Sequence, residues 1–537
     1  MDATSDELTS CFPWPVPPHP AVVPVPLCHA GWSSNSTEAV LANLKDNHQR
    51  WHIFFGDKHF HNHAAHHLLT IYAMGAPASL LNAAYHTHAV YLKPAFQPPE
   101  TNEKRIAREA AAKVVIDDTN WKDYLGDDRY YQAYASFFSS KLLDKAAGKN
   151  VIQHVLEDYV FSIDANLTPG KSANGQRPLV LACFLSGFMH PHIHAGYGAE
   201  FGLPGLIAEG VSEAAVQLSE ADAPLTPDLF GAAANATDLA SKVTSLAFSS
   251  AASISNVHAL EILARVANDP TFAPHNIRRL VPADADKKSV DRVVCIGGTI
   301  LVEYLTSWFG TVNEDVATLR AKFEEIVWMN TVIYAVAGWA ERELGEDETK
   351  EFNGDFFLMH LVTSSLLTSS LLNVLIPKSA ALLLRTSFAL SIVLYVTRGR
   401  PPLPIDAFYA HTTTHPHPPG PTPTPDKDML PPNEPRSQLT PNLWFPIVQT
   451  VFVHPNEHLC KTQRALYHFA EWFGGTRART FAGLSSPDLS SLGGGGLTGA
   501  EMLDGTLFLH AAWLTAGRLG WMREGEKGHM WDGIAEI

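Results

Sequence analysis

The sequence predicts an all-α or nearly all-α protein, folded as one large helical bundle or array. Most segments repeat apolar residues at the three- and four-residue spacing of a helix, and no series of short β-branched strands joined by hairpin turns is present. With 537 residues, of which 46% are hydrophobic and 18% charged, the chain can bury a substantial core. No repeat of fixed period divides it into a solenoid.

The chain begins with a predicted extended arm at residues 1–34. Its run CFPWPVPPHPAVVPVP, at 11–26, holds too many prolines for a helix or a central strand. We expect the first helix over 35–51, where Asn35 can cap the helix and Glu38 follows three residues later.

Further helices are expected over 119–147 and 315–344, with breaks. The uncharged stretch FFLMHLVTSSLLTSSLLNVLIP, at 356–377, is expected to be a buried core helix. It contains His360, Asn373, two threonines and four serines. A membrane-spanning helix normally needs about 20 more uniformly apolar residues, so we do not expect this stretch to cross a membrane.

The predicted helical domain, residues 35–537, is interrupted by two loops. The proline-rich segment 400–442 is expected to be a long insert in one domain, because motifs described below lie on both sides of it. The histidines of HPHPP, at 415–419, are expected to be solvated within this insert. GGGG at 493–496 is expected in a flexible surface loop.

Charge and cysteine usage limit the partners and the location of the protein. A formal net charge of −16 argues against nucleic acid or an anionic membrane as the main partner. The polar, acidic start MDATSDELTS is unlike a secretory or mitochondrial signal, and the end GIAEI is no peroxisomal signal. Five scattered cysteines without C-x-x-C spacing suit a reducing compartment, so we expect an intracellular, cytoplasmic protein: Cys11, Cys28, Cys183, Cys295 and Cys460.

Histidine is frequent, with 26 residues, and HFHNHAAHH at 59–67 is its densest cluster. His63 shares a helix face with His66 and His67, because residues three and four apart are neighbours on a helix. Asn62 is placed to cap this helix or to orient the rings. The alternative is a helix start with ordinary polar residues in its first turn.

Three further segments hold histidine in helical or apolar surroundings. In FMHPHIHAGYGAEFGLPG (188–205), Pro191 suits a helix start, and His190 and His194 face one side. The glycines there follow no strand and open no βαβ unit, so a dinucleotide site is not expected. His360 is a lone ring in DFFLMHLVTSS, and HPNEHLCKTQRAL begins a predicted helix with a histidine and a lysine three apart.

Together these segments predict a nitrogen-rich metal centre inside a helical bundle. The chain has no H-E-x-x-H, no H-x-D/E, and only one E-x-x-H, so a common zinc protease, a two-histidine-one-carboxylate iron site and a paired-carboxylate di-iron site are not expected. Imidazole ligands suit iron, copper, nickel or zinc, and the residues alone leave that choice open.

The blocks HNHAAHHLLTIYAMGA, HPHIHAGYGAEF, DFFLMHLVTSSLL and EHLCKTQRAL, in this order and separation, resemble the questin oxidase-like family. The resemblance covers most of residues 35–535. It implies a fungal enzyme of secondary metabolism that oxidatively opens the central ring of an anthraquinone, a reaction described as Baeyer–Villiger-like. The chain lacks the glycine fingerprint and the F-x-G-x-x-x-H-x-x-x-W-P signature of flavin enzymes of that type.

Mapped onto this chain, the family blocks give one imidazole from each of four segments. The predicted catalytic and metal-binding residues are His63, His190, His360, His458 and Lys461. As a ligand the lysine must be neutral or carbamylated, since an ammonium has no lone pair. The alternative, non-catalytic role of Lys461 is a salt bridge to a surface acid such as Glu457 or Glu471.

Other side chains are assigned supporting roles. His66, His67 and His194 are the candidates for orienting the ligands or contacting substrate. Lys378, in LLNVLIPKSAALLLR, is the runner-up lysine, because apolar surroundings would lower its pKa.

The preferred hypothesis is a mononuclear non-haem Fe(II) dioxygenase with O2 as co-substrate and a small aromatic polyketide as substrate. Phenylalanine, tyrosine and tryptophan are numerous enough to line an aromatic pocket. The alternatives are an NADPH-assisted or cofactor-independent Baeyer–Villiger-type monooxygenase, a hydrolytic zinc enzyme, and a non-catalytic helical binding protein.

Overall fold

The computed structural model describes most of the chain between residues 5 and 533. The ranges left undescribed inside these limits are 17–18, 56–59, 94–109, 112, 149, 171–176, 219–256, 274, 276–288, 310–313, 342, 345–349, 412–417, 431–438 and 486–495.

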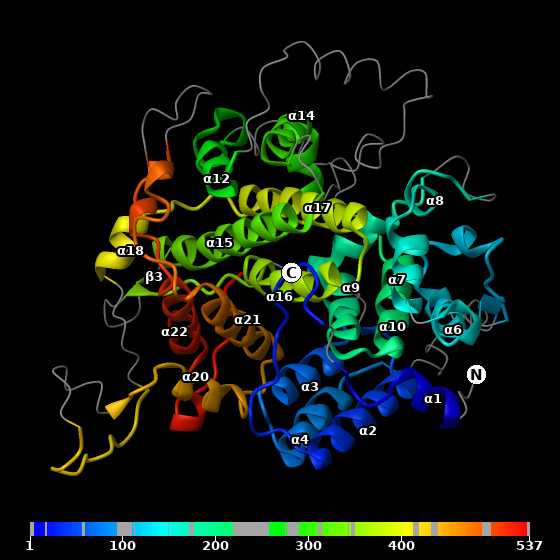
Figure 1. The fold of residues 1–537 in the computed structure, drawn as a ribbon, viewed down its shortest axis with the longest axis horizontal. Helices are drawn as coiled ribbons and strands as arrows, with labels where there is room; N and C mark the ends of the chain where they lie inside the picture. Colours follow the sequence, from blue (N-terminus) through cyan, green and yellow to red (C-terminus); the bar gives the residue numbers. More distant parts are fainter. Residues whose placement is uncertain are drawn as a thin grey trace.

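The described chain is essentially all-α, as the sequence predicts (Figure 1). Its α-helices are α1 (Ser5–Cys11), α2 (Ser34–Arg50), α3 (Ala64–Ala73), α4 (Ala78–Ala89), α6 (Tyr131–Leu142), α7 (Val151–Leu156), α8 (Ile163–Asn166), α9 (Val180–Phe201), α10 (Pro204–Val216), α12 (Ala259–Asn268), α14 (Ser289–Phe309), α15 (Val316–Ala340), α16 (Met359–Leu372), α17 (Pro377–Thr397), α18 (Ile405–His411), α20 (Trp444–Val451), α21 (Glu457–Phe473) and α22 (Leu507–Leu519). Two short antiparallel pairs join β1 (Phe54–Phe55) to β2 (Phe60–His61) and β3 (Glu343–Leu344) to β4 (Lys350–Glu351).

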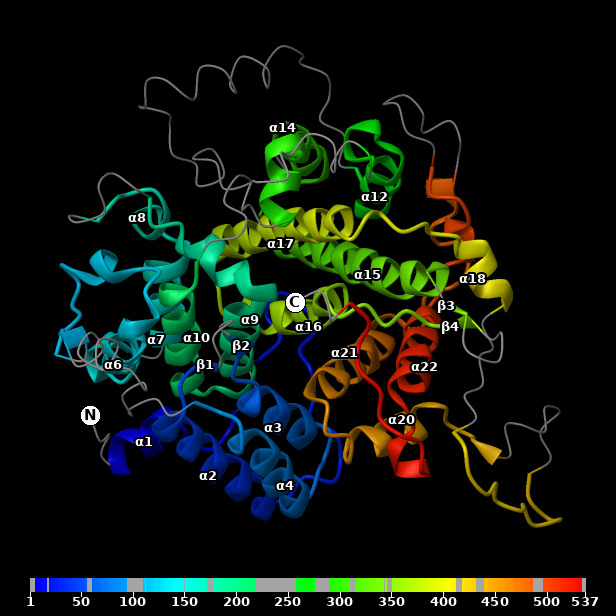
Figure 2. The ribbon, with the colours of Figure 1, turned by 180° about the vertical axis from the view of Figure 1, so that it is seen from behind.

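Helix α16 occupies the centre of the molecule. It packs against α9, α15, α17 and α21, and every one of its residues is buried. Figures 1 and 2 show α2, α3 and α4 together at one end of the molecule and α12 and α14 at the opposite end, with α15 and α17 crossing between them. The helices that carry His190, His458 and Lys461 therefore pack on the helix that carries His360, and α3 packs on both of them.

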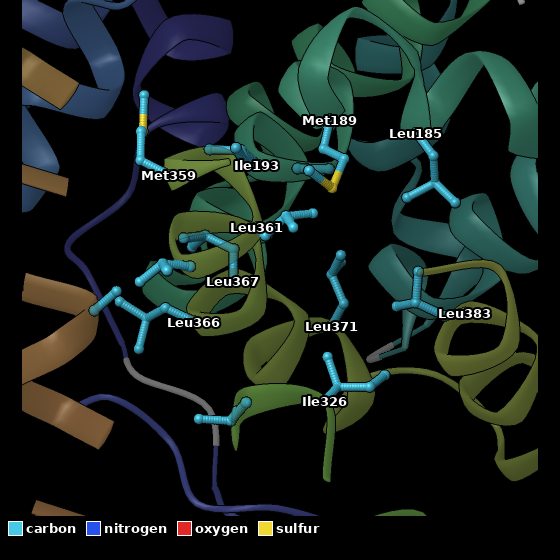
Figure 3. Close-up of a cluster of buried hydrophobic side chains, with 14 of the residues drawn as sticks. Leu185, Met189, Ile193, Ile326, Met359, Leu361, Leu366, Leu367, Leu371 and Leu383 are labelled. Carbon is cyan, nitrogen blue, oxygen red and sulfur yellow. The ribbon is translucent and has the colours of Figure 1, made fainter. Parts of the chain in front are cut away.

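Leucines make α16 apolar on all its faces. Figure 3 shows Leu361, Leu366 and Leu371 of α16 among Met189 of α9 and Ile326 of α15. Most serines and threonines of α16 donate their hydroxyls to carbonyls within the same helix, as Ser365 does to Leu361 at 2.7 Å, whereas Ser370 is buried without a partner. The expected buried core helix at 356–377 is confirmed over α16.

One helix among the described residues is long and apolar enough to cross a membrane, and it is α17 rather than α16. Within its most apolar window, 83% is buried inside the structure. Burial of this kind is what the core helix of a globular protein also shows.

Three local expectations need correction. The N-terminal arm is not wholly extended, since α1 forms in it where Leu8 and Cys11 face the core. Helix α2 is capped by Ser33 instead of Asn35, because Ser33 and Ser36 form a reciprocal capping box. The proline-rich insert contains helix α18, whose Ile405 and Phe408 are buried.

Other expectations are confirmed or lie outside the described residues. The predicted 119–147 region is helical with breaks, and 316–340 is the continuous helix α15. The histidines of HPHPP and most of GGGG fall outside the described chain. The domain boundaries stay a prediction.

Candidate metal centre

Four imidazoles from four separate segments face one another in the core. His63 directly precedes α3, His190 lies in α9, and His360 and His458 are the second residues of α16 and α21. Ring centroids are 4.7 Å apart for His63 and His190, 4.5 Å for His63 and His458, and 5.1 Å for His360 to each of His190 and His458. All four side chains are buried. The sequence therefore predicted correctly which four histidines meet.

The outer ring nitrogen of each of these histidines faces an acceptor. Nδ1 of His360 donates to the carbonyl of Phe356 at 2.8 Å, and Nδ1 of His190 donates to the carbonyl of Gly187. Nδ1 of His458 and of His63 lie 3.0 and 3.5 Å from one carboxylate oxygen of Glu457. A proton held on Nδ1 leaves the lone pair on Nε2, which is the tautomer that a metal ligand requires.

The inner nitrogens lack ordinary partners. Nε2 of His63 and Nε2 of His190 are 2.6 Å apart, so only one of them can carry a proton between them. Nε2 of His360, Nε2 of His458 and Nζ of Lys461 are buried without any hydrogen-bond partner. Buried polar atoms are rarely left unsatisfied, and donor atoms of His63, His190 and His458 lie within 4.8 Å of one another. This donor set fits a transition-metal ion.

Burial keeps the imidazoles uncharged and makes the lysine easier to deprotonate. It lowers the pKa of His63, His190 and His360 well below the usual value, and with the Lys461 charge it lowers the pKa of His458 to about 4. Burial also lowers the pKa of Lys461 to about 8. Neutral imidazoles and an easily deprotonated amine are prepared to donate lone pairs.

Glu457 supplies the negative charge of the centre. Burial opposes its ionisation, but the neighbouring His458 outweighs this and holds the pKa of Glu457 well below its usual range. Sequence analysis considered Glu457 only as a salt-bridge partner of Lys461. In the structure its carboxylate orients His63 and His458, and Nζ of Lys461 has no hydrogen-bond partner. The alternative prediction, that Lys461 forms a surface salt bridge, is therefore wrong.

A kink in α9 delivers His190. Gly187, Phe188 and Met189 have left-handed backbone angles, with φ of 58°, 55° and 64°, and the helix resumes at His190 and Pro191. A Cβ on Gly187 would lie 2.7 Å from the ring of His61, which stacks on His190 at 4.1 Å. Non-glycine residues in this conformation cost roughly 1–2 kcal/mol each, so the surrounding packing must hold the turn.

An anchored turn before α16 and a capped start of α21 position the other rings. Asp355 accepts from the backbone of Phe357 and Leu358 at the start of α16, and Arg398 donates to its other oxygen at 2.8 Å. Asn456 accepts from the backbone of His458 and Leu459 at the start of α21, both at 3.1 Å. The positive end of a helix dipole disfavours a protonated imidazole, so both starts favour neutral His360 and His458.

Comparison with known proteins agrees with this site. A family model described as questin oxidase-like matches residues 60–466, about three quarters of the chain, and this span includes all five predicted site residues. The chain belongs to the questin oxidase-like family.

Curated members of this family give its general chemistry. A Baeyer–Villiger oxidase of Pestalotiopsis microspora is 28% identical over 387 residues, covering 70% of this chain and 76% of that protein. A Baeyer–Villiger monooxygenase of Aspergillus aculeatus is 31% identical over 34% of this chain and 33% of its own length, and the questin oxidase of Aspergillus terreus is 26% identical over 37% and 38%. This questin oxidase-like chain is an oxidoreductase.

Around the centre of this family member lie polar groups that sequence analysis missed. Nε2 of His61 is 3.3 Å from Glu213, and His194 donates to Glu209 at 2.6 Å. The two glutamates are four residues apart on α10, otherwise uncharged and buried. Two carboxylates one turn apart in such a helix were the signal that could have found them.

The expected supporting residues are only partly placed as predicted. His66 lies beside His63 and reaches His194 at 3.2 Å, in line with both as orienting residues. His67 turns away and pairs with His88 at 3.0 Å, so it does not share the face of His63. Lys378 is exposed in the first turn of α17, so the apolar surroundings assumed for it are wrong.

Proposed function

We propose that this protein is a non-haem iron oxygenase that breaks a carbon–carbon bond to open the central ring of an anthraquinone-type polyketide. The observation that carries the proposal is the convergence of four inward-facing imidazole nitrogens, two of them without any partner, on rings whose outer nitrogens each face an acceptor. Such preparation of neutral imidazoles is characteristic of metal ligands and unnecessary in a purely structural core.

In this proposal Nε2 of His63, His190, His360 and His458 would hold the iron. Iron bound there would supply the one-electron chemistry that lets O2 react with an electron-rich aromatic ring. Glu457 would keep His63 and His458 in the right tautomer and offset part of the metal charge.

Lys461 would complete the set of ligands, either as a neutral amine or as a carbamate. In the second case carbon dioxide forms a bond to the neutral amine nitrogen and a proton is released, which leaves an anionic oxygen donor. Burial without a partner supports both forms, because a permanently charged ammonium in that place would be costly. Intact-protein mass spectrometry under native conditions distinguishes them.

Aromatic side chains on one side of the centre would exclude water. Phe188 lies 5.6 Å from His360 and Phe356 lies 5.0 Å from His458, both measured between ring centroids. An apolar wall suits a flat aromatic substrate and strengthens electrostatic interactions inside the site. A small aromatic polyketide in a fungal secondary pathway is the proposed partner, and an intracellular location stays a prediction.

The second candidate is a Baeyer–Villiger-type monooxygenase without a metal, favoured by the names of the relatives. Turnover of anthraquinones in labelled dioxygen separates the two. The iron dioxygenase places both labelled oxygen atoms in the product and needs no NADPH once the iron is ferrous. A monooxygenase places one there, consumes NADPH and is indifferent to iron chelators; that result would overturn the first proposal.

A further inference from the structure

A second group of metal-ligand side chains lies at the far end of α21. His468 and Glu471 stand one turn apart on this helix, and His29 approaches them from the segment that precedes α2. Each of the three offers a donor atom, and these atoms all lie within 4.8 Å of one another. Nδ1 of His468 donates to Glu471 at 2.7 Å, and the rings of His29 and His468 have centroids 5.3 Å apart.

The imidazoles of this group have unused lone-pair positions. Nε2 of His29 and Nε2 of His468 are buried and have no hydrogen-bond partner. The side chain of His468 is fully buried, whereas that of Glu471 is 41% exposed. Burial lowers the pKa of His29 to about 4 and that of His468 well below the usual value, so both rings are neutral.

The nearby charges leave the group with a net negative environment. Arg464, one turn before His468, disfavours a cation there, but it is paired with the buried carboxylate of Glu200. Glu471 then adds a carboxylate that no arginine or lysine pairs with in the described chain. Two neutral imidazoles and one carboxylate therefore face a site that can accept a divalent cation.

We propose that His29, His468 and Glu471 form a second metal site, which takes Zn²⁺ or a similar first-row divalent ion. Two histidine nitrogens and one carboxylate are a common protein ligand set for zinc, with water in the remaining position. Metal–ligand bonds of about 2.0–2.2 Å place neighbouring donors about 3.3 Å apart. Donors that now lie within 4.8 Å of one another would draw together, and the ion would replace the proton between Nδ1 of His468 and Glu471.

The site would act as a clamp between two distant parts of the sequence. The backbone of His29 already donates to the carbonyl of Ala73, at the end of α3. A metal ion shared with His468 and Glu471 would fasten the same segment to α21, the helix that carries His458 and Lys461 at its other end. The inference goes beyond the proposed oxygenase and does not depend on it.

Zinc chloride titrated calorimetrically into the metal-free full-length chain tests this proposal. The Glu471→Gln variant is expected to bind one zinc ion fewer per chain than the wild type, whatever number the central histidines hold. It keeps the size of a largely accessible side chain, so folding is preserved. Glu38→Gln, the same change at an exposed position of α2, is the matched control and is expected to bind as the wild type does.

His29→Ala provides the second test. It is expected to lose the same zinc ion, and zinc is expected to raise its melting temperature less than that of the wild type. Equal zinc stoichiometry and affinity in wild type, Glu471→Gln and His29→Ala would overturn the proposal, even if the central site proved to bind no metal.

Discussion

The two ends of α21 present the same spacing of polar side chains in opposite surroundings. His458 and Lys461 at the first end are three residues apart, as are His468 and Glu471 at the second. The first pair is buried, with Lys461 only 1% exposed, while Glu471 opens the second pair to solvent. Spacing alone therefore does not distinguish a catalytic centre from a site at the surface.

What distinguishes them is the number of segments that converge. The central site collects rings from four segments and places an acceptor beside every outer nitrogen, so little reorganisation is needed to bind a metal. The surface site has one hydrogen-bonded ring and a partly exposed carboxylate donor. Slow metal exchange is expected at the centre and fast, chelator-sensitive exchange at the surface.

Removal of a central ring is expected to have the largest effect. His360→Ala should lower activity and central metal content by more than about 100-fold, because loss of a ligand exceeds the 10- to 100-fold loss typical of an orienting residue. The surface site should keep its zinc, as measured by elemental analysis of chelator-washed protein. His510→Ala is the matched control, since that ring is also buried and partnerless; loss of metal there would contradict the comparison.

Replacement of each of the two carboxylates of α21 in turn should affect metal binding at one site only. Glu457→Gln is expected to weaken central metal binding by about 10- to 100-fold, because the amide no longer holds the protons of His63 and His458. Glu471→Gln should leave central binding unchanged. Competition with a coloured chelator measures both, and equal effects of the two variants at the centre would show that the sites are not independent.

Acid should destabilise the metal-free chain, and the central histidines are among the buried rings that contribute. His63, His190 and His360 stay neutral in the fold, with lowered pKa, but take up protons on unfolding near pH 6.5. The unfolded chain binds more protons below that pH, so stability is full above it and falls as the pH drops. Each ring contributes about 1.4 kcal/mol per pH unit.

Denaturant unfolding between pH 7 and pH 5 measures this slope. His360→Ala should flatten it by the contribution of one ring. An unchanged slope in that variant would mean that His360 does not titrate as the buried geometry requires.

Disturbance of the α9 kink should have a smaller, local effect. Gly187→Ala is expected to destabilise by about 1–2 kcal/mol from the left-handed backbone alone, with a further loss where the new Cβ meets His61. Gly298→Ala in α14, where nothing lies within 4 Å of the added atom, should instead stabilise by about 0.5–1 kcal/mol. Thermal melts of both variants measure these changes in stability. Metal titrations of Gly187→Ala test the role of the kink, and unchanged central metal binding would show that it is not needed to place His190.

Helical periodicity was sufficient to predict most of the helices, and the resemblance to the questin oxidase-like blocks singled out the four central rings. Local pattern failed where partners are far apart in sequence. Glu457 is adjacent to His458, yet its contact with His63 joins residues separated by nearly three quarters of the chain. His67 was assigned to the face of His63 by helical spacing, and it does follow His63 by one turn, but its ring pairs with His88 instead.

The lysines show the same limit. Lys378 sits in an apolar stretch of sequence but projects from the first turn of α17. Lys461 sits in a polar stretch and is buried. Burial of a long side chain depends on which elements cover it, and sequence neighbours do not determine that.

The central claim is that a metal ion held by the four core histidines is required for activity. Elemental mass spectrometry on active protein, washed with a chelator to clear the surface site, tests it most directly. The account predicts about one iron per chain in active wild type and none in His360→Ala. Active protein without a stoichiometric transition metal would contradict it.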